Sequence, residues 1–419
     1  MTSPPLTMSP NYLVTLRGLR ELHRLTVAGR LDSPEADAVR DATDVPWEAL
    51  DELEKKRLSG LSEDLYSITD SPRSETKESN PQAQARLADI AQANQIGDWN
   101  RVLELSRRWG AYIEPSTLSY WRGAAWANAG DPETAEIFYK HASDLQPNNG
   151  NYLAIWLATL NKTAPTAAED WARKILQHPV DLSPNVVVTA SNILFNPVRE
   201  LGEAEASRFF REIIPTLTTA LERLEAGDEG GRDDAVFTLV CYLLGFSHEF
   251  LRENQAASAF YSKGLGASPT NDALLVARGI LRYGESPLAL EDFKLAIQSG
   301  TTLVWPYSFL AHHHVMANQF EQARVFCERG LEMNGSNSAR SELAELLAIS
   351  QSALGFPIEI VRSSFELATR LNPFNEQARR NFAAFETAIQ PIRLALYETR
   401  TRATVKASGL SERRLARVA

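Results

Sequence analysis

The chain has 419 residues, of which 44% are hydrophobic and 23% charged, and its formal net charge is −10. That excess of acid argues against a protein whose main task is to coat nucleic acid or an anionic membrane. Two cysteines, Cys241 and Cys327, are too few for a disulfide framework, and each lies in an apolar stretch typical of a buried free thiol. No run approaches the ~18 apolar residues of a membrane span, and the first residues lack a secretory signal pattern. We therefore expect a cytoplasmic protein without a membrane span.

The first segment, residues 1–69, is predicted to form a small group of about three helices, because leucines recur at helical spacing. Gly29 is expected to end the first helix. Ser33 followed by Pro34 is typical of the start of the second. Ser62 is expected to cap a short further helix. We interpret the segment as a helical cap or docking element.

Two segments have a composition that does not favour a packed core. Residues 70–83 are rich in Ser, Pro and charge and contain no large apolar residue, so burial cannot offset the entropy of ordering them. They are predicted to be a flexible linker. Residues 391–419 carry seven basic and two acidic residues, a charge of +5, whereas residues 1–390 carry −15. This basic C-terminal tail is interpreted as a solvated end, a latch on the acidic body or a contact with an anionic partner.

Residues 84–390 form a run of amphipathic helical patterns joined by short turns, with Gly or Pro roughly every 34 to 40 residues. Such a period indicates a helical repeat array, because one helix pair cannot bury its own apolar face and needs stacked neighbours. The spacing breaks between Pro184 and Gly230. There, residues 199–225 are predicted to form one longer helix.

The clearest unit, Glu114 to Pro147, resembles the tetratricopeptide repeat. Its small, aromatic and proline residues fall at that family's offsets: Gly123, Trp126, Ala135, Tyr139, Ala142 and Pro147. A second unit matches at Gly245, Ala257, Tyr261 and Pro269, and a third, with a turn two residues shorter, at Gly279, Ala289, Phe293 and Ala296. Small residues allow helices A and B of a pair to approach closely, while aromatic residues fill the space between adjacent units.

The resemblance implies an all-α fold, a right-handed solenoid of helix pairs, whose common activity is to hold a peptide or helix in a concave groove. The family's groove positions, carried over one residue at a time, give these candidate partner-binding residues: Tyr120, Asn128, Tyr242, Phe246, Glu249, Phe250, Ile280, Tyr283, Trp305, Ser308, His312 and Met316. The lining is apolar and aromatic, and it lacks the basic side chains with which chaperone-binding members hold a C-terminal carboxylate. It therefore favours an apolar helix face, supplied by a partner or by this chain itself.

No arrangement of residues indicates catalysis. His312, His313 and His314 are adjacent, so a helix points them about 100° apart, whereas two metal ligands on one helix need a spacing of three or four. No Gly-rich phosphate loop followed by Lys and Ser or Thr occurs. The sequence therefore predicts no enzyme, no cofactor, no metal site and no small-molecule substrate.

We predict a scaffold or adaptor that binds another protein, with nucleic acid not expected among its partners. The alternative is a regulatory or sensor subunit that contacts an anionic surface, including nucleic acid, through its basic tail. Salt dependence separates the two hypotheses, because counterion release makes phosphate binding fall steeply with salt while apolar binding changes little.

Overall fold

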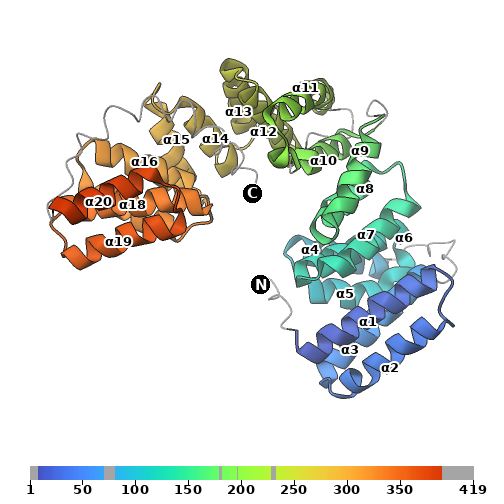
Figure 1. Cartoon of the computed structure of the whole chain (residues 1–419). Helices are drawn as coiled ribbons and strands as arrows, with labels where there is room; N and C mark the ends of the chain where they lie inside the picture. Colours follow the sequence, from blue (N-terminus) through green and yellow to red (C-terminus); the bar gives the residue numbers. More distant parts are fainter. Residues whose placement is uncertain (1–7, 70–80, 179–181, 196, 228–232, 389–419) are drawn as a thin grey trace. The chain divides into compact units, whose positions relative to one another are not determined.

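The computed structural model describes residues 8–69, 81–178, 182–195, 197–227 and 233–388. In these ranges the chain forms twenty α-helices and no strand, apart from an isolated bridge between Leu303 and Asn334. The predicted all-α fold is confirmed. The chain divides into two compact units, Met1–Ile193 and Leu194–Ala419 (Figure 1).

The first unit holds nine helices and most of a tenth: α1 (Pro10–Val27), α2 (Pro34–Glu48), α3 (Glu52–Thr69), α4 (Pro81–Gln95), α5 (Trp99–Trp109), α6 (Pro115–Ala129), α7 (Pro132–Leu145), α8 (Gly150–Thr163), α9 (Pro165–Ile175) and α10 (Pro184–Phe195). Proline occupies the first turn of α1, α2, α6, α7 and α9, where its missing N–H leaves no hydrogen bond unmade. Side-chain oxygens of Ser9, Asp98, Asp131 and Asn149 accept backbone N–H bonds at four helix starts.

The helices α1, α2 and α3 form the N-terminal group, and α1 packs on both of the others (Figure 1). The chain turns at Gly29, which has a φ of +67°, and Ser33 caps α2 as predicted. In contrast, α3 continues unbroken through Ser62, so the helix start predicted there is wrong. The reason is that Leu61 and Leu65 continue one buried stripe across that residue.

Buried ion pairs attach the N-terminal group to the helices that follow it. Asp64 of α3 is 1% exposed and lies 2.9 Å from Arg107 Nη2 of α5 and 2.8 Å from Arg122 Nη2 of α6. Arg20 of α1 lies 2.9 Å from Asp131, the residue that caps α7. The pKa of Asp64 lies above its ordinary value, because the effect of burial exceeds the opposing effect of the Arg122 and Arg107 guanidinium groups.

The second unit holds the end of α10 and ten further helices: α11 (Glu203–Ala226), α12 (Asp234–Phe250), α13 (Asn254–Ala267), α14 (Asp272–Arg282), α15 (Leu288–Gln298), α16 (Trp305–Met316), α17 (Phe320–Leu331), α18 (Asn337–Ala353), α19 (Ile358–Leu371) and α20 (Glu376–Ala388). The predicted longer helix is α11, with 24 residues. The predicted C-terminal tail, residues 391–419, lies outside the described residues, as do residues 70–80 of the predicted linker. The last residues of that linker, from Pro81, belong to α4.

Contacts between helices run in sequence order within each unit. The strongest pairs are α6 with α7, α12 with α13, α14 with α15, α16 with α17, and α18 with α19, and each pair also packs on the next one within its unit. Repeat arrays have this pattern, because each unit contacts only its neighbours. Near the end of the array, α18 contacts α16, α17, α19 and α20, so most of its side chains are buried.

Candidate partner-binding site

The residues predicted to define the repeat meet inside the helix pairs. A Cβ atom on Gly123 of α6 would lie 2.7 Å from Cδ1 of Tyr139 on α7. A Cβ atom on Gly245 of α12 would lie 2.3 Å from Cε1 of Tyr261 on α13. The shorter turn between α14 and α15 preserves the same glycine–aromatic contact, at 2.6 Å. Three helix pairs therefore share one close approach that only a residue without a side chain permits.

The second helix of each pair presents a matching stripe of small residues. Ala135 and Ala142 on α7 and Ala257 on α13 are all 0% exposed. The prolines that follow, Pro147 and Pro269, each come two residues after the last helical residue, where a helix cannot continue. The fold is tetratricopeptide-like.

Comparisons with known proteins give a fold likeness alone. No family model matches the sequence, and no curated protein matches it. Among solved structures, the chain is similar to a tetratricopeptide repeat protein from Parabacteroides merdae, with 12% identity and a TM-score of 0.38, over 69% of this chain and 100% of that one. It is also similar to the TPR2AB domain of yeast Sti1 in a complex with pHSP90, with 14% identity and a TM-score of 0.23, over 65% and 97%. The tetratricopeptide-like assignment is carried by the contacts within this chain.

Five of the predicted groove residues in the second unit lie in the packing between helices. Each is at most 7% exposed: Phe246, Glu249, Ile280, Trp305 and Ser308. The ring of Phe246 lies 6.0 Å from that of Phe195 at the end of α10 and 5.7 Å from that of Phe210 on α11. Glu249 accepts a hydrogen bond from the Tyr261 hydroxyl at 2.8 Å. These side chains support the repeat and leave little surface for a partner.

A second set remains accessible on successive A helices. Tyr242, Phe250, Tyr283 and His312 are half-buried, and Met316 is 36% exposed. Phe250 packs on Phe210 of α11, with 4.7 Å between the ring centroids, and belongs to that phenylalanine cluster. The remaining four residues, Tyr242, Tyr283, His312 and Met316, are called the aromatic face below.

The aromatic face is held together by a contact between two helices. The hydroxyl of Tyr283, the residue that ends α14, lies 2.8 Å from Nδ1 of His312 on α16. The ring of Tyr283 packs against Phe309 of α16, with 4.6 Å between the centroids. Tyr242 of α12 packs against the same hydrophobic core. Tyr283 and His312, which are 29 residues apart in the sequence, therefore share one surface of the second unit, and Tyr242 is assigned to the same face by its position in the repeat.

The first unit carries its two predicted groove residues on α6. Tyr120 is half-buried and stacks on Tyr152 of α8, with 5.4 Å between ring centroids and 29° between ring planes. The hydroxyl groups of Tyr152 and Thr117 lie 3.2 Å apart. Asn128 is exposed at the end of the helix. Here the first unit has a small tyrosine surface of its own.

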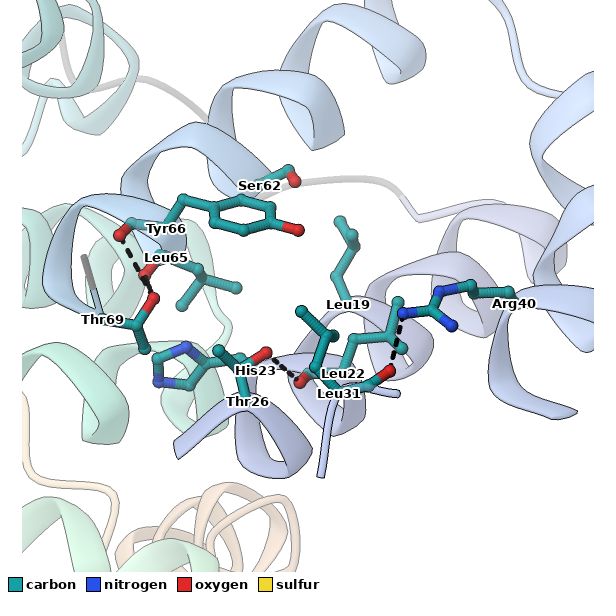
Figure 2. Close-up of a pocket in the computed structure, with 10 residues that line it drawn as sticks. All are labelled: Leu19, Leu22, His23, Thr26, Leu31, Arg40, Ser62, Leu65, Tyr66 and Thr69. Carbon is teal, nitrogen blue, oxygen red and sulfur yellow. Dashed lines mark hydrogen bonds between the residues drawn. The ribbon is translucent and has the colours of Figure 1, made fainter. Parts of the chain in front are cut away.

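A pocket that sequence reasoning missed lies within the N-terminal helical group. Figure 2 shows Leu19 and Leu22 of α1 facing Leu65 and Tyr66 of α3. The pocket between them has a volume of about 90 Å³. The lining residues share a mainly apolar surface with a few polar atoms: Leu19, Leu22, His23, Thr26, Leu31, Arg40, Ser62, Leu65, Tyr66 and Thr69. No sequence motif marks such a pocket, because its walls come from three segments whose spacing depends on tertiary packing.

The polar groups that line this pocket are largely occupied by local bonds. Arg40 donates to the Leu31 carbonyl oxygen at 2.8 Å, and the Thr26 hydroxyl donates to the Leu22 carbonyl at 2.8 Å (Figure 2). Burial, aided by the nearby His141, lowers the pKa of His23 and favours its neutral form. The pocket therefore offers apolar contact rather than a charged or catalytic group.

The described residues show no arrangement suited to metal chemistry. Across them, no three His, Cys, Asp or Glu side chains lie together as metal ligands would. The neighbouring histidines turn to separate partners: His312 to Tyr283, and His314 through Nδ1 to Gln319 Oε1 at 2.6 Å. Cys327 is fully buried, which raises the pKa of its thiol. In the same part of the chain, no helix combines the length and apolarity needed to cross a membrane.

Proposed function

We propose that this protein is an interaction module that holds another polypeptide against the aromatic face of its second unit. The main support is the contact between Tyr283 and His312, which joins two successive A helices into one surface. Half-buried aromatic side chains are already fixed in orientation, so they lose little rotamer freedom on binding and still have apolar area to bury. The apolar side of a helix or peptide suits such a surface.

The burial pattern narrows the predicted groove. Phe246 and Trp305 are 3% and 5% exposed, so truncating either would remove core packing and report on folding rather than on recognition. Partner contacts are therefore assigned to Tyr242, Tyr283, His312 and Met316. This assignment makes the face smaller than the sequence suggested and more readily tested.

The test is an affinity purification with the full-length chain and two matched variants. The face variant carries Tyr242→Ser and Met316→Ser. The control variant carries Ile96→Ser and Trp171→Ser, which remove side chains of the first unit that are 44% and 42% exposed. We expect one partner protein to bind the wild type and the control but not the face variant, with all three chains showing the same helical circular dichroism. Equal capture by the folded face variant would reject the proposal.

The salt dependence of the captured complex tests the alternative function, binding of an anionic surface through the basic tail. The +5 charge of residues 391–419 is the observation that favours it. Binding to phosphates should weaken by orders of magnitude between about 50 and 200 mM salt, because each neutralised phosphate releases a counterion. Capture that survives this change and depends on the aromatic face supports the interaction module.

A further inference from the structure

We infer that the aromatic face has an intramolecular occupant, the chain's own basic segment 389–419, which a second protein must displace. The inference rests on the proposed function of this face and adds its regulation. It follows from three properties of the chain: the charge of the second unit, the composition of the segment, and the point at which the segment is attached.

The charge of the second unit is opposite to that of the segment. Residues 194–388 contain 17 basic and 25 acidic residues, a net charge of −8, whereas residues 389–419 carry +5. Exposed acidic residues of the unit include Glu291 on α15 and Glu332 at the end of α17, and both helices pack on α16 of the aromatic face. The acidic unit and the basic segment therefore attract each other, although salt screens this attraction beyond about 10 Å.

The composition of the segment also suits an apolar surface that has acidic surroundings. Its first part contains Ile392, Leu394 and Leu396, and its last part contains Leu415 and Val418, with basic residues between and beside them. Apolar side chains can bury the remaining area of Tyr242 and Met316, while arginines approach the carboxyl groups nearby. An acidic or purely polar segment would have neither property.

The segment follows directly from α20, which belongs to the same unit as the face. Thirty-one residues separate Ala388 from the end of the chain, and when extended they reach roughly 100 Å. Attachment to the same unit gives the segment an effective concentration on the order of 1 mM. A segment with an intrinsic Kd of about 0.1 mM would then occupy the face about 90% of the time. It would lower the apparent affinity of a competing partner for the face about tenfold.

The experiment measures binding of a fluorescein-labelled peptide of residues 389–419 to full-length chains by fluorescence anisotropy. An open chain carries Arg400→Glu, Arg402→Glu and Lys406→Glu, so that its own segment no longer competes. We expect the open chain to bind the peptide about tenfold more tightly than the wild type does. A charge-matched chain with Arg208→Glu, Arg211→Glu and Arg379→Glu, all exposed outside the segment, should bind as weakly as the wild type.

Two further open chains locate the binding surface. Adding Tyr242→Ser and Met316→Ser to the open chain should abolish the tighter binding, whereas adding Trp171→Ser should leave it unchanged. Equal binding by the wild-type and open chains would overturn the inference, as would binding that ignores the aromatic face. The peptide assay involves no second protein. An open chain that binds the peptide but captures no partner would therefore reject the proposed function, while still supporting occupancy of the aromatic face by the segment.

Discussion

Gly245 on α12 and Tyr261 on α13 approach so closely that a Cβ atom on the glycine would lie 2.3 Å from Cε1 of the tyrosine ring. The same tyrosine donates its hydroxyl hydrogen to Glu249 at 2.8 Å, and both side chains are 0% exposed. The missing side chain at position 245 thus sets the distance between two helices and also the hydrogen bond of a buried acid. Glu249 can be buried at a lower cost because its carboxyl group accepts a hydrogen bond from the Tyr261 hydroxyl.

Replacing this glycine should therefore destabilise the array. Gly245→Ala and Gly123→Ala each force a tyrosine ring to move, and we expect each to lower the free energy of unfolding by about 1–3 kcal/mol. The control is Gly266→Ala on α13, where the added Cβ would meet no atom within 4 Å apart from the backbone of its own helix. That change should be neutral or stabilising by up to about 1 kcal/mol, because alanine favours helix. The free energies of unfolding are measured by urea denaturation. A loss for Gly266→Ala as large as for the other two variants would contradict a special role for the glycine–tyrosine contacts.

The buried ion pairs of Asp64 should control attachment of the N-terminal helices. Asp64→Ala leaves the Arg122 guanidinium, whose side chain is 6% exposed, without this carboxylate, and we expect a loss of about 3–5 kcal/mol. Hydrogen exchange should then rise in α1, α2 and α3. The control is Glu104→Ala, which removes an exposed ion pair with Arg101 and should change stability by less than about 1 kcal/mol. Similar exchange in both variants would show that apolar packing alone attaches the group.

Glu345 on α18 should make the stability of the last helices depend on pH. Burial raises the pKa of this carboxyl from 4.5 to about 8, although Asn381 Nδ2 of α20 donates to its Oε1 at 2.7 Å. The pKa of Glu345 is higher in the folded state than in the unfolded state. Its contribution to the free energy of unfolding is therefore fully present below about pH 4.5 and is lost as the pH rises through about 8. In Glu345→Gln this loss should disappear, with a gain of several kcal/mol at pH 8.

The measurement for Glu345 is the Tm of the wild type and the variant between pH 5 and about 8.5. Glu366→Gln, an exposed substitution on α19, serves as the control and should follow the wild-type profile. Parallel profiles for Glu345→Gln and the wild type would mean that the buried carboxyl does not titrate in this range.

Phe246 and Tyr242 should behave differently although both were predicted to line one groove. Phe246→Ala removes a ring from the cluster with Phe195 and Phe210 and should cost about 3–5 kcal/mol. Tyr242→Ser removes a half-buried side chain and should cost less while weakening capture of a partner. Thermal unfolding and affinity purification of the two variants check this division. If the Phe246→Ala chain were as stable as the wild type, Phe246 would not be a core residue and would again be a candidate for partner contact.

The sequence by itself determined the helical repeat and its register. Three sequence offsets between a glycine and an aromatic residue carry this register: Gly123 to Tyr139, Gly245 to Tyr261, and Gly279 to Phe293. Each offset depends only on helix geometry and on a small residue facing a large one. Such local spacings decide which side chains meet within a pair, so they can be read without knowing the neighbours. Handedness of the superhelix stays a prediction.

Only the tertiary structure decided which residues of helix A remain accessible. Register places Phe246 and Tyr242 on one helix face, but the burial of Phe246 depends on Phe195 and Phe210, which come from the region where the repeat spacing breaks. The pairing of Asp64 with Arg107 and Arg122 likewise joins three helices that no sequence period relates. Local spacing defines which faces helices present, whereas burial and ion pairing depend on packing partners that are distant in the sequence.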